Sequence, residues 1–394
     1  MIAIRKQYIY LFIALCLLKP DIYAQSTYTT ECDVIIKEQS RRPLDFPVND
    51  ILPDERTSDI YLISDEFVQR GNESYQKPVK FGDALAVWDE RIYTIEYQPY
   101  SAHPDSYMAG MKVTTRAYGL QNNHLVLMDS TIGHADEGGP GPLWYWNKNG
   151  VRLPCELMEV FAGYGEKSVL INRYNTDNDQ PDFEYMIFQE KDTVKSGSLK
   201  HPEKQNTYIK ATKLIADGIL LYSEDNTTRQ HFLTKYNLEG AFIWEKPVNR
   251  LSLAMYKKRG EGIHITQDGE LLHISTWGME KGTLKCTLYT LDAHTGNVLW
   301  SYPIKGTDMR ILQVLLVGQN IGVITAQLVQ DPSDMHTYSF KSGKLEMLDR
   351  GGALVCSRDL EDGFKLILAN YTENKLDVIT DKSILTFKVD NSLR

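Results

Sequence analysis

The sequence predicts an all-β protein, a single β-propeller of about seven four-stranded blades, with six or eight blades also compatible with its spacing. Strand-like segments follow one another from residue 58 to the C-terminus. Turn-forming pairs recur among them at Asp217-Gly218, Asp268-Gly269, Gln319-Asn320 and Asp362-Gly363. The intervals of 51, 51 and 43 residues are close to the ~40–50 residues of one propeller blade.

The strand-like segments share a length of four to eight residues, a richness in β-branched and aromatic side chains, and boundaries at Gly, Asp, Asn or Pro. No window of a dozen residues keeps a helical period with caps, so little helix is expected. In chain order the segments are SDIYLI, ALAVW, RIYTIEY, MKVTTRAY, HLVLM, SVLINRY, FEYMIF, ILLYS, HFLTKY, LLHIS, LKCTLYTL, VLLVG, IGVITAQL, ALVC, KLILANY, LDVIT and ILTFKV.

Residues 1–24 have the pattern of a secretory signal peptide. Arg5 and Lys6 form a basic start, an apolar run extends from Tyr8 to Leu18, and Ala24 offers a small residue for cleavage. The run is too short to cross a bilayer, so no transmembrane segment is expected, although an N-terminal core strand or anchor is the alternative. We expect a bacterial protein exported to the periplasm or to the cell surface, or secreted.

Residues 25–57 predict an irregular N-terminal arm, because they are charged and contain Pro43, Pro47 and Pro53. This arm is expected to pack over the fold or to lend it one strand. The propeller domain then occupies residues 58–394. Its last segment, KSILTFKV, is expected to share a sheet with the arm, which would cover two strand edges that otherwise invite aggregation.

The stretch LYTLDAHTGNVLWSYP predicts a hairpin with a defined turn. Asp292 and Thr295 can hydrogen-bond to the turn backbone, and Gly296 can adopt the positive φ that closes it. The same frame recurs earlier, where Gly240 precedes Trp244 by the four residues that separate Gly296 from Trp300. A weaker copy in TYSFKSGKLEML gives Gly343 this turn role without the tryptophan. Trp244 and Trp300 are therefore expected to dock on the next blade.

Residues Asp292, Thr295, Gly296 and Trp300 resemble the repeat of PQQ-like β-propellers, A-x-D-x-x-T-G-x-x-x-W, with Thr290 at the Ala position. The resemblance covers about a quarter of the chain. Members of this family are quinone-dependent dehydrogenases or non-catalytic scaffolds, such as the lipoprotein that assists outer-membrane barrel assembly. The dehydrogenases are usually longer and carry adjacent cysteines that stack on the quinone. This chain has no adjacent cysteines, so the resemblance implies a non-dehydrogenase member without a cofactor.

Charge and cysteine content narrow the class of partner. The formal net charge is −9, and it becomes −11 after removal of residues 1–24, which disfavours binding to nucleic acid or anionic lipid. The mature chain keeps four cysteines: Cys32, Cys155, Cys286 and Cys356. Their disulfide state is open, but Cys286 and Cys356 lie in apparent strands and are expected to be buried small hydrophobic residues rather than a bridge.

The segment from Gly133 to Trp146 carries the strongest candidates for a functional site. His134, Asp136 and Glu137 supply acid–base groups, which are candidate catalytic residues. Trp144, Tyr145 and Trp146 could stack on a sugar or on a partner's side chain, which makes them the expected ligand-binding residues. The alternative is that this segment is a wide connection between blades and that its tryptophans only pack.

Two further groups of residues are candidate metal ligands. Asp177, Asp179 and Asp182 lie in an oxygen-rich loop that could hold Ca²⁺, although a solvated loop explains these turn residues as well. His264 and His273 bracket the Asp268-Gly269 turn and could face one another across a hairpin. Histidines at such positions are more often ordinary strand residues, so no metal is expected.

The sequence thus favours an exported, non-catalytic binding or scaffold protein that recognises a protein partner or a glycan through loops at one end of the propeller channel. The alternative function is a glycan-active hydrolase or lyase that uses His134, Asp136 and Glu137. Convergence of these side chains with Trp144 in one pocket would favour the enzyme. The sequence does not indicate the oligomeric state.

Overall fold

The computed structural model describes residues 32, 35–54, 57, 59–88, 90–100, 110–135, 143–146, 152–155, 162–164, 167–173, 183–189, 192–199, 207–251, 265–331 and 334–390. Thirty-one β-strands lie in these ranges. No helix in the described ranges has the length and apolar character needed to cross a membrane. The prediction of an all-β protein is confirmed.

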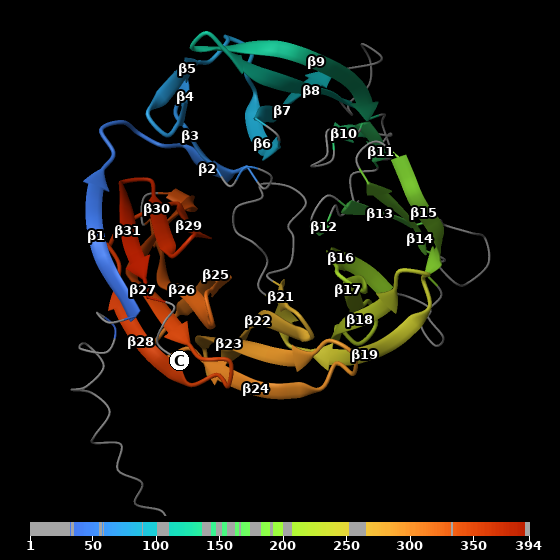
Figure 1. The fold of residues 1–394 in the computed structure, drawn as a ribbon. Helices are drawn as coiled ribbons and strands as arrows, with labels where there is room; N and C mark the ends of the chain where they lie inside the picture. Colours follow the sequence, from blue (N-terminus) through green and yellow to red (C-terminus); the bar gives the residue numbers. More distant parts are fainter. Residues whose placement is uncertain are drawn as a thin grey trace, which may run out of the picture.

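The strands form small antiparallel sheets that follow one another around a common centre, which is the arrangement of a β-propeller (Figure 1). In the later part of the chain each sheet is a meander, with its first strand nearest the centre and its last strand at the rim (Figure 1). Three such sheets are β12 (Ala162–Tyr164) to β15 (Asp192–Leu199), with β13 (Lys167–Arg173) and β14 (Phe183–Gln189) between them; β16 (Thr207–Ile215), β17 (Gly218–Asp225), β18 (His231–Asn237) and β19 (Phe242–Val248); and β25 (Met309–Val317), β26 (Asn320–Asp331), β27 (Asp334–Leu348) and β28 (Leu354–Asp359).

A fourth sheet, between the last two of these, has its inner strand in two pieces. β20 (Arg250–Leu251) and β21 (Ile265–Asp268) both pair with β22 (Leu271–Glu280), which is followed by β23 (Thr283–Asp292) and β24 (Val298–Pro303). The turns at Asp217, Gly269 and Gln319 separate the first two strands of their sheets, as the sequence predicts.

The earlier part of the chain contributes two four-stranded meanders that a single parallel residue pair, Gln76 with His124, joins into one sheet. A short hairpin of β10 (Leu143–Trp146) and β11 (Arg152–Cys155) follows them. The strands of the two meanders are β2 (Asp50–Pro53), β3 (Ile60–Ile63), β4 (Phe67–Arg70) and β5 (Glu73–Gln76), then β6 (Asp83–Trp88), β7 (Arg91–Tyr100), β8 (Gly110–Gln121) and β9 (His124–Ala135).

Burial differs between the second strand of a sheet and its rim strand. The second strand of one sheet, β17, is buried over its first six residues, GILLYS, because neighbouring sheets cover both of its faces. The rim strand β24 is mostly exposed. This difference explains why β17 begins as a continuous apolar segment, whereas the exposed side chains of β24 need no apolar neighbour.

The N-terminal and C-terminal parts of the chain share one sheet. β1 (Ile36–Pro43) runs antiparallel to β31 (Ser383–Val389), beside β30 (Lys375–Thr380) and β29 (Ile367–Thr372). The arm therefore lends a strand, as the sequence predicts, and this strand is the outermost one of its sheet (Figure 1). Residues 25–57 are not irregular throughout, since β1 and β2 are regular strands.

A disulfide between Cys32 and Cys356 holds the arm to β28 in the neighbouring sheet. The two Cα atoms are 4.9 Å apart, although 324 residues separate them in the sequence. The prediction that Cys356 is an unbridged hydrophobic residue is wrong. Its partner lies in the arm, too far along the sequence for a local pattern to indicate it. Cys286 is free and buried, as predicted, and burial raises the pKa of its thiol. The side chain of Cys155 lies outside the described residues.

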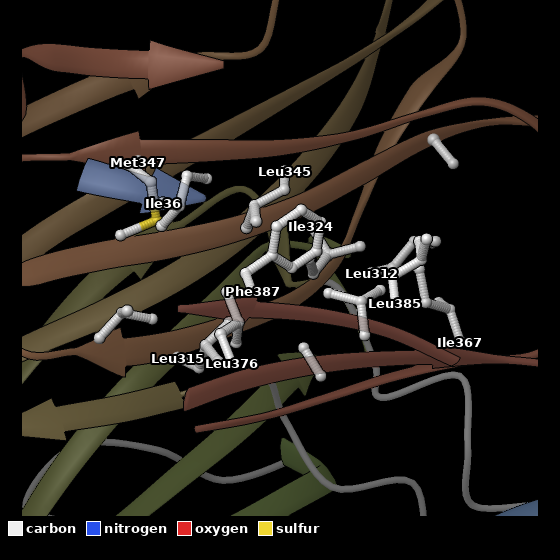
Figure 2. Close-up of a cluster of buried hydrophobic side chains, with 14 of the residues drawn as sticks. Ile36, Leu312, Leu315, Ile324, Leu345, Met347, Ile367, Leu376, Leu385 and Phe387 are labelled. Atoms are coloured by element: carbon white, nitrogen blue, oxygen red, sulfur yellow. The ribbon is translucent and has the colours of Figure 1, made fainter. Parts of the chain in front are cut away.

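The disulfide lies in an apolar core between the sheet of β25–β28 and the sheet that contains β1. Side chains from both sheets interdigitate there (Figure 2). They include Ile36, Leu312, Leu315, Ile324, Leu345, Met347, Ile367, Leu376, Leu385 and Phe387. Apolar burial and a covalent link thus act at the same place, where the two ends of the chain meet.

A recurring contact joins consecutive sheets. The Trp244 indole nitrogen donates to the Ala293 carbonyl at 3.0 Å, and a β-carbon placed on Gly296 would lie 2.8 Å from the Trp244 ring. Likewise, the Trp300 nitrogen donates to the Arg350 carbonyl at 2.9 Å. Both tryptophans dock on the next sheet, as predicted.

The Trp300 contact corrects the predicted position of the third repeat. The glycine under Trp300 is Gly352, with φ +83°, whereas Gly343 lies inside β27. Gly352 follows Gly296 by 56 residues, the interval that separates Gly296 from Gly240. The prediction that Asp362-Gly363 is the first turn of a sheet is also wrong, because this pair lies in the connection between β28 and β29. The first turn of that sheet is Glu373-Asn374, where both residues have positive φ.

Substitution of the docking glycine should reveal this contact. Gly352→Ala is expected to lower the free energy of unfolding by about 2–5 kcal/mol, because it combines left-handed backbone strain with a collision against Trp300. In a Trp300→Ala background the collision term should disappear, so the two substitutions should not be additive. Denaturant titration followed by circular dichroism measures all three variants.

Gly269→Ala is the matched control. Gly269 also has positive φ, at +58°, but apart from Gly269 itself and its two chain neighbours no described atom lies within 4 Å of the added carbon. Its cost is expected to be only about 1–2 kcal/mol. Equal losses for Gly269→Ala and Gly352→Ala would show that the Trp300 contact does not control the packing of these sheets.

Removal of the disulfide should loosen the junction between the N-terminal arm and the sheet of β25–β28. The double variant Cys32→Ser/Cys356→Ser is expected to lose about 2–5 kcal/mol of stability. Dithiothreitol should lower the melting temperature of the wild-type protein towards that of the variant and leave the variant unchanged. A wild-type melting temperature that does not respond to the reductant would contradict this assignment.

Candidate functional site

The segment favoured by the sequence lies at the junction of β9 and β10. His134 is near the end of β9, and β10 contains Trp144, Tyr145 and Trp146. β10 lies beside β9 and pairs with β11, so that Trp144 is opposite Pro154 and Trp146 is opposite Arg152. Asp136 and Glu137 lie outside the described residues, as do the side chains of the other four. Their role as a functional site stays a prediction.

The candidate calcium ligands Asp177, Asp179 and Asp182 also lie outside the described residues, as does His264. His273 is described and is fully buried on β22. Its Nδ1 is 2.7 Å from the Thr290 hydroxyl, and its ring centroid is 6.0 Å from that of Trp300. Burial lowers the pKa of His273 to about 4, so the ring is neutral at physiological pH. Within the described ranges, no group of three or more His, Cys, Asp or Glu side chains is arranged to hold a metal ion.

A groove of about 930 Å³ is lined by residues of both the sheet of β16–β19 and the sheet of β20–β24. We call it the inter-sheet groove. Its lining comes from the start of β18, the end of β19, β20, the second half of β22, β23, and the turn before β24. These six pieces span about seventy residues of sequence, and no local motif connects them.

The floor of the inter-sheet groove is apolar. Ile274 and Leu291 are buried, and Tyr289, which pairs with Ile274 across β22 and β23, is partly buried against them. Met279 and Val298, by contrast, line the groove with 64% and 56% of their surface exposed. Large aliphatic side chains with this exposure offer an apolar contact to a ligand.

Every charged side chain among the described lining residues is basic: Arg229, Lys246 and Arg250. Arg229 is 3.0 Å from the Glu224 carboxylate, which neutralises part of its charge. Lys246 Nζ donates to the neutral amide oxygen of Asn297, at 3.1 Å. The Arg250 guanidinium lies 4.6 Å from the centre of the Trp277 ring, a cation–π arrangement that holds the side chain flat without cancelling its charge.

A hydrogen-bonded group fixes the end of the groove near Arg250. The Tyr222 hydroxyl accepts from the Leu251 amide at 3.2 Å and lies 3.1 Å from His231 Nδ1. The His231 ring also stacks on Tyr222, with centroids 5.4 Å apart. If the buried phenol donates its own proton to Nδ1, the neutral imidazole carries its proton on Nε2. Burial lowers the pKa of His231, which favours this neutral form.

No protein-family model and no curated protein matches the sequence. Among solved structures, BamB from Moraxella catarrhalis is 11% identical over 90% of this chain and 100% of that chain, with a TM-score of 0.35. The WD40 domain of SCAP from fission yeast is 8% identical over 88% of this chain and 85% of that one, at 0.36. The computationally designed Ika8 protein is 7% identical over 88% and 98%, at 0.37. Because these TM-scores are below 0.5, the fold assignment rests on sheet order and arrangement.

The burial of neutral His273 gives stability a defined pH dependence. Its folded pKa of about 4 is below its unfolded value of 6.5, so the unfolded chain binds the proton first as the pH falls. The stabilisation is complete above pH 6.5 and is lost as the pH falls towards 4, to a limit of about 3 kcal/mol. Urea titrations between pH 4 and 7 measure it.

His273→Gln is expected to remove this part of the pH dependence. His294→Gln is the control, because the His294 side chain is 57% exposed. The assignment is wrong if the pH profile of His273→Gln matches that of the wild-type protein.

Proposed function

We propose that the protein is an exported, non-catalytic β-propeller that binds a protein partner or a glycan and acts as a scaffold. The observation that carries the proposal is the inter-sheet groove, which combines an apolar floor, exposed aliphatic side chains and basic groups. Such a mixture of apolar surface and a few placed charges is typical of a ligand-binding cleft.

The proposed domain has seven blades and follows a signal peptide at residues 1–24. Seven four-stranded groups within the described ranges support this count when β10 and β11 are treated as an insertion after the β6–β9 blade. The repeat at Asp292–Trp300 supports membership of the PQQ-like propellers, without a quinone.

The Cys32–Cys356 disulfide supports export. It is buried in the core that joins the two ends of the chain. Structural disulfides of this kind form in oxidising compartments such as the periplasm or the extracellular space. The disulfide and the signal-peptide pattern of residues 1–24 therefore both support the proposed export.

The segment that contains Trp144, Tyr145 and Trp146 is a second proposed contact region. Its support is the clustering of three aromatic residues next to β9, since aromatic side chains dominate many binding surfaces. Asp136 and Glu137 precede it, so the same segment provides the test that separates binding from catalysis.

The mature protein, immobilised, is expected to retain a specific partner from the native cell envelope or a glycan on an array. Trp144→Ala should weaken capture at least tenfold at an unchanged melting temperature, because it removes an aromatic contact. The double variant Asp136→Ala/Glu137→Ala should weaken capture only partly.

Two outcomes would contradict this proposal. Loss of a glycan-cleaving activity in the carboxylate variant, with binding retained, would indicate an enzyme. Unfolding of Trp144→Ala would show that the aromatic residues belong to the core and not to a contact surface.

A further inference from the structure

We propose that the occupant of the inter-sheet groove is an acidic peptide segment of a protein partner, one that carries an aliphatic or aromatic residue between its carboxylates. This inference rests on the proposed binding function and selects a protein segment over a glycan. It assigns carboxylate recognition to Lys246 and Arg250, and apolar recognition to Met279 and Val298.

Charge is the first argument for an acidic occupant. The chain has a formal net charge of −9, yet the charged groups of the described groove lining are all basic. Lys246 has a neutral amide as its hydrogen-bond acceptor and Arg250 has an aromatic ring as its neighbour. Each keeps a positive charge with which a carboxylate can form a charge-assisted hydrogen bond. A basic groove on an acidic protein also concentrates an anionic ligand locally.

The state of the aromatic groups argues against a sugar. A glycan platform requires a free aromatic face, but the Arg250 guanidinium covers the Trp277 ring at 4.6 Å, and the Tyr289 ring is partly buried against the apolar floor. Trp277 also packs with the apolar cluster between β22–β24 and β25–β28. The exposed groups are instead the aliphatic side chains of Met279 and Val298. These suit an apolar side chain, and methionine adapts readily to its shape.

The geometry of the groove also suits an extended segment. Lys246 lies in the second half of β19 and Arg250 begins β20, whereas Met279 lies near the end of β22 and Val298 begins β24. Because paired strands carry all four residues, their backbone positions are set by the sheets and not by the ligand. Such preorganisation reduces the entropy lost on binding.

Fluorescence polarisation of the full mature protein tests the proposal. The probe is a short fluorescein-labelled peptide in which glutamates flank one Phe and one Leu. We expect saturable binding that weakens as salt increases. Binding should be lost when lysine replaces each glutamate, and it should weaken about tenfold when serine replaces Phe and Leu.

Variants of the groove should separate the two kinds of contact. Arg250→Glu and Lys246→Glu are each expected to weaken binding of the acidic peptide at least tenfold, and Met279→Ser with Val298→Ser about tenfold. Lys388→Glu is the matched control, since it makes the same charge change at an exposed position of β31, in a sheet remote from the groove (Figure 1). Its affinity should equal that of the wild-type protein. Melting temperatures identify any variant that fails to fold. If only one of Arg250→Glu and Lys246→Glu folds, that variant alone tests the assignment.

Capture of the envelope partner by Arg250→Glu separates the groove assignment from the proposed binding function. If the envelope partner is captured equally by wild-type protein and by Arg250→Glu, the binding function stands and the groove assignment falls. If polygalacturonate binds and the acidic peptides do not, the occupant is an anionic glycan and the inference is overturned. Absence of binding by either probe to the wild-type protein also overturns it.

Discussion

The arrangement of consecutive sheets depends on one contact, the packing of a large aromatic ring onto a turn glycine of the next sheet. Tyr185, Trp244 and Trp300 make it in succession, on Gly240, Gly296 and Gly352. Each glycine has positive φ and no room for a side chain. The glycine therefore does two things: it closes its own turn, and it allows the neighbouring ring to approach the backbone closely.

Polar groups complete this contact where it is most buried. The Ala293 carbonyl accepts from both Trp244 and Lys235, whose Nζ lies at 2.8 Å and also meets Asp217 at 2.6 Å. Lys235 is only 2% exposed, so its charge requires these partners. The same turn backbone thus satisfies a buried indole and a buried ammonium group. The strand pairing of β1 with β31 and the Cys32–Cys356 bond then join the chain ends.

The inter-sheet groove follows from this rigid construction. The tryptophan contact holds the sheets of β16–β19 and β20–β24 together near the Gly296 turn, while the other ends of the strands carry Arg250, His231 and Met279. The binding surface that we propose is therefore formed between two packed sheets. Met279 and Val298 are exposed and lie outside the apolar cluster of these sheets, so they are available to the ligand that we propose.

The sequence by itself determined the strand content and the hairpin at Asp292–Gly296, including the docking of Trp244 and Trp300. These features depend on local periodicity and on turn residues a few positions apart, which a single sequence displays directly. Only the tertiary structure decided that Cys32 meets Cys356, that Gly352 and not Gly343 receives Trp300, and that Arg229, Lys246 and Arg250 line one groove. The aromatic and acidic segment from His134 to Trp146 was found by composition alone, and composition does not determine how side chains converge. The physical reason is separation along the chain: a disulfide across 324 residues or a groove made from six segments leaves no periodic trace in the sequence.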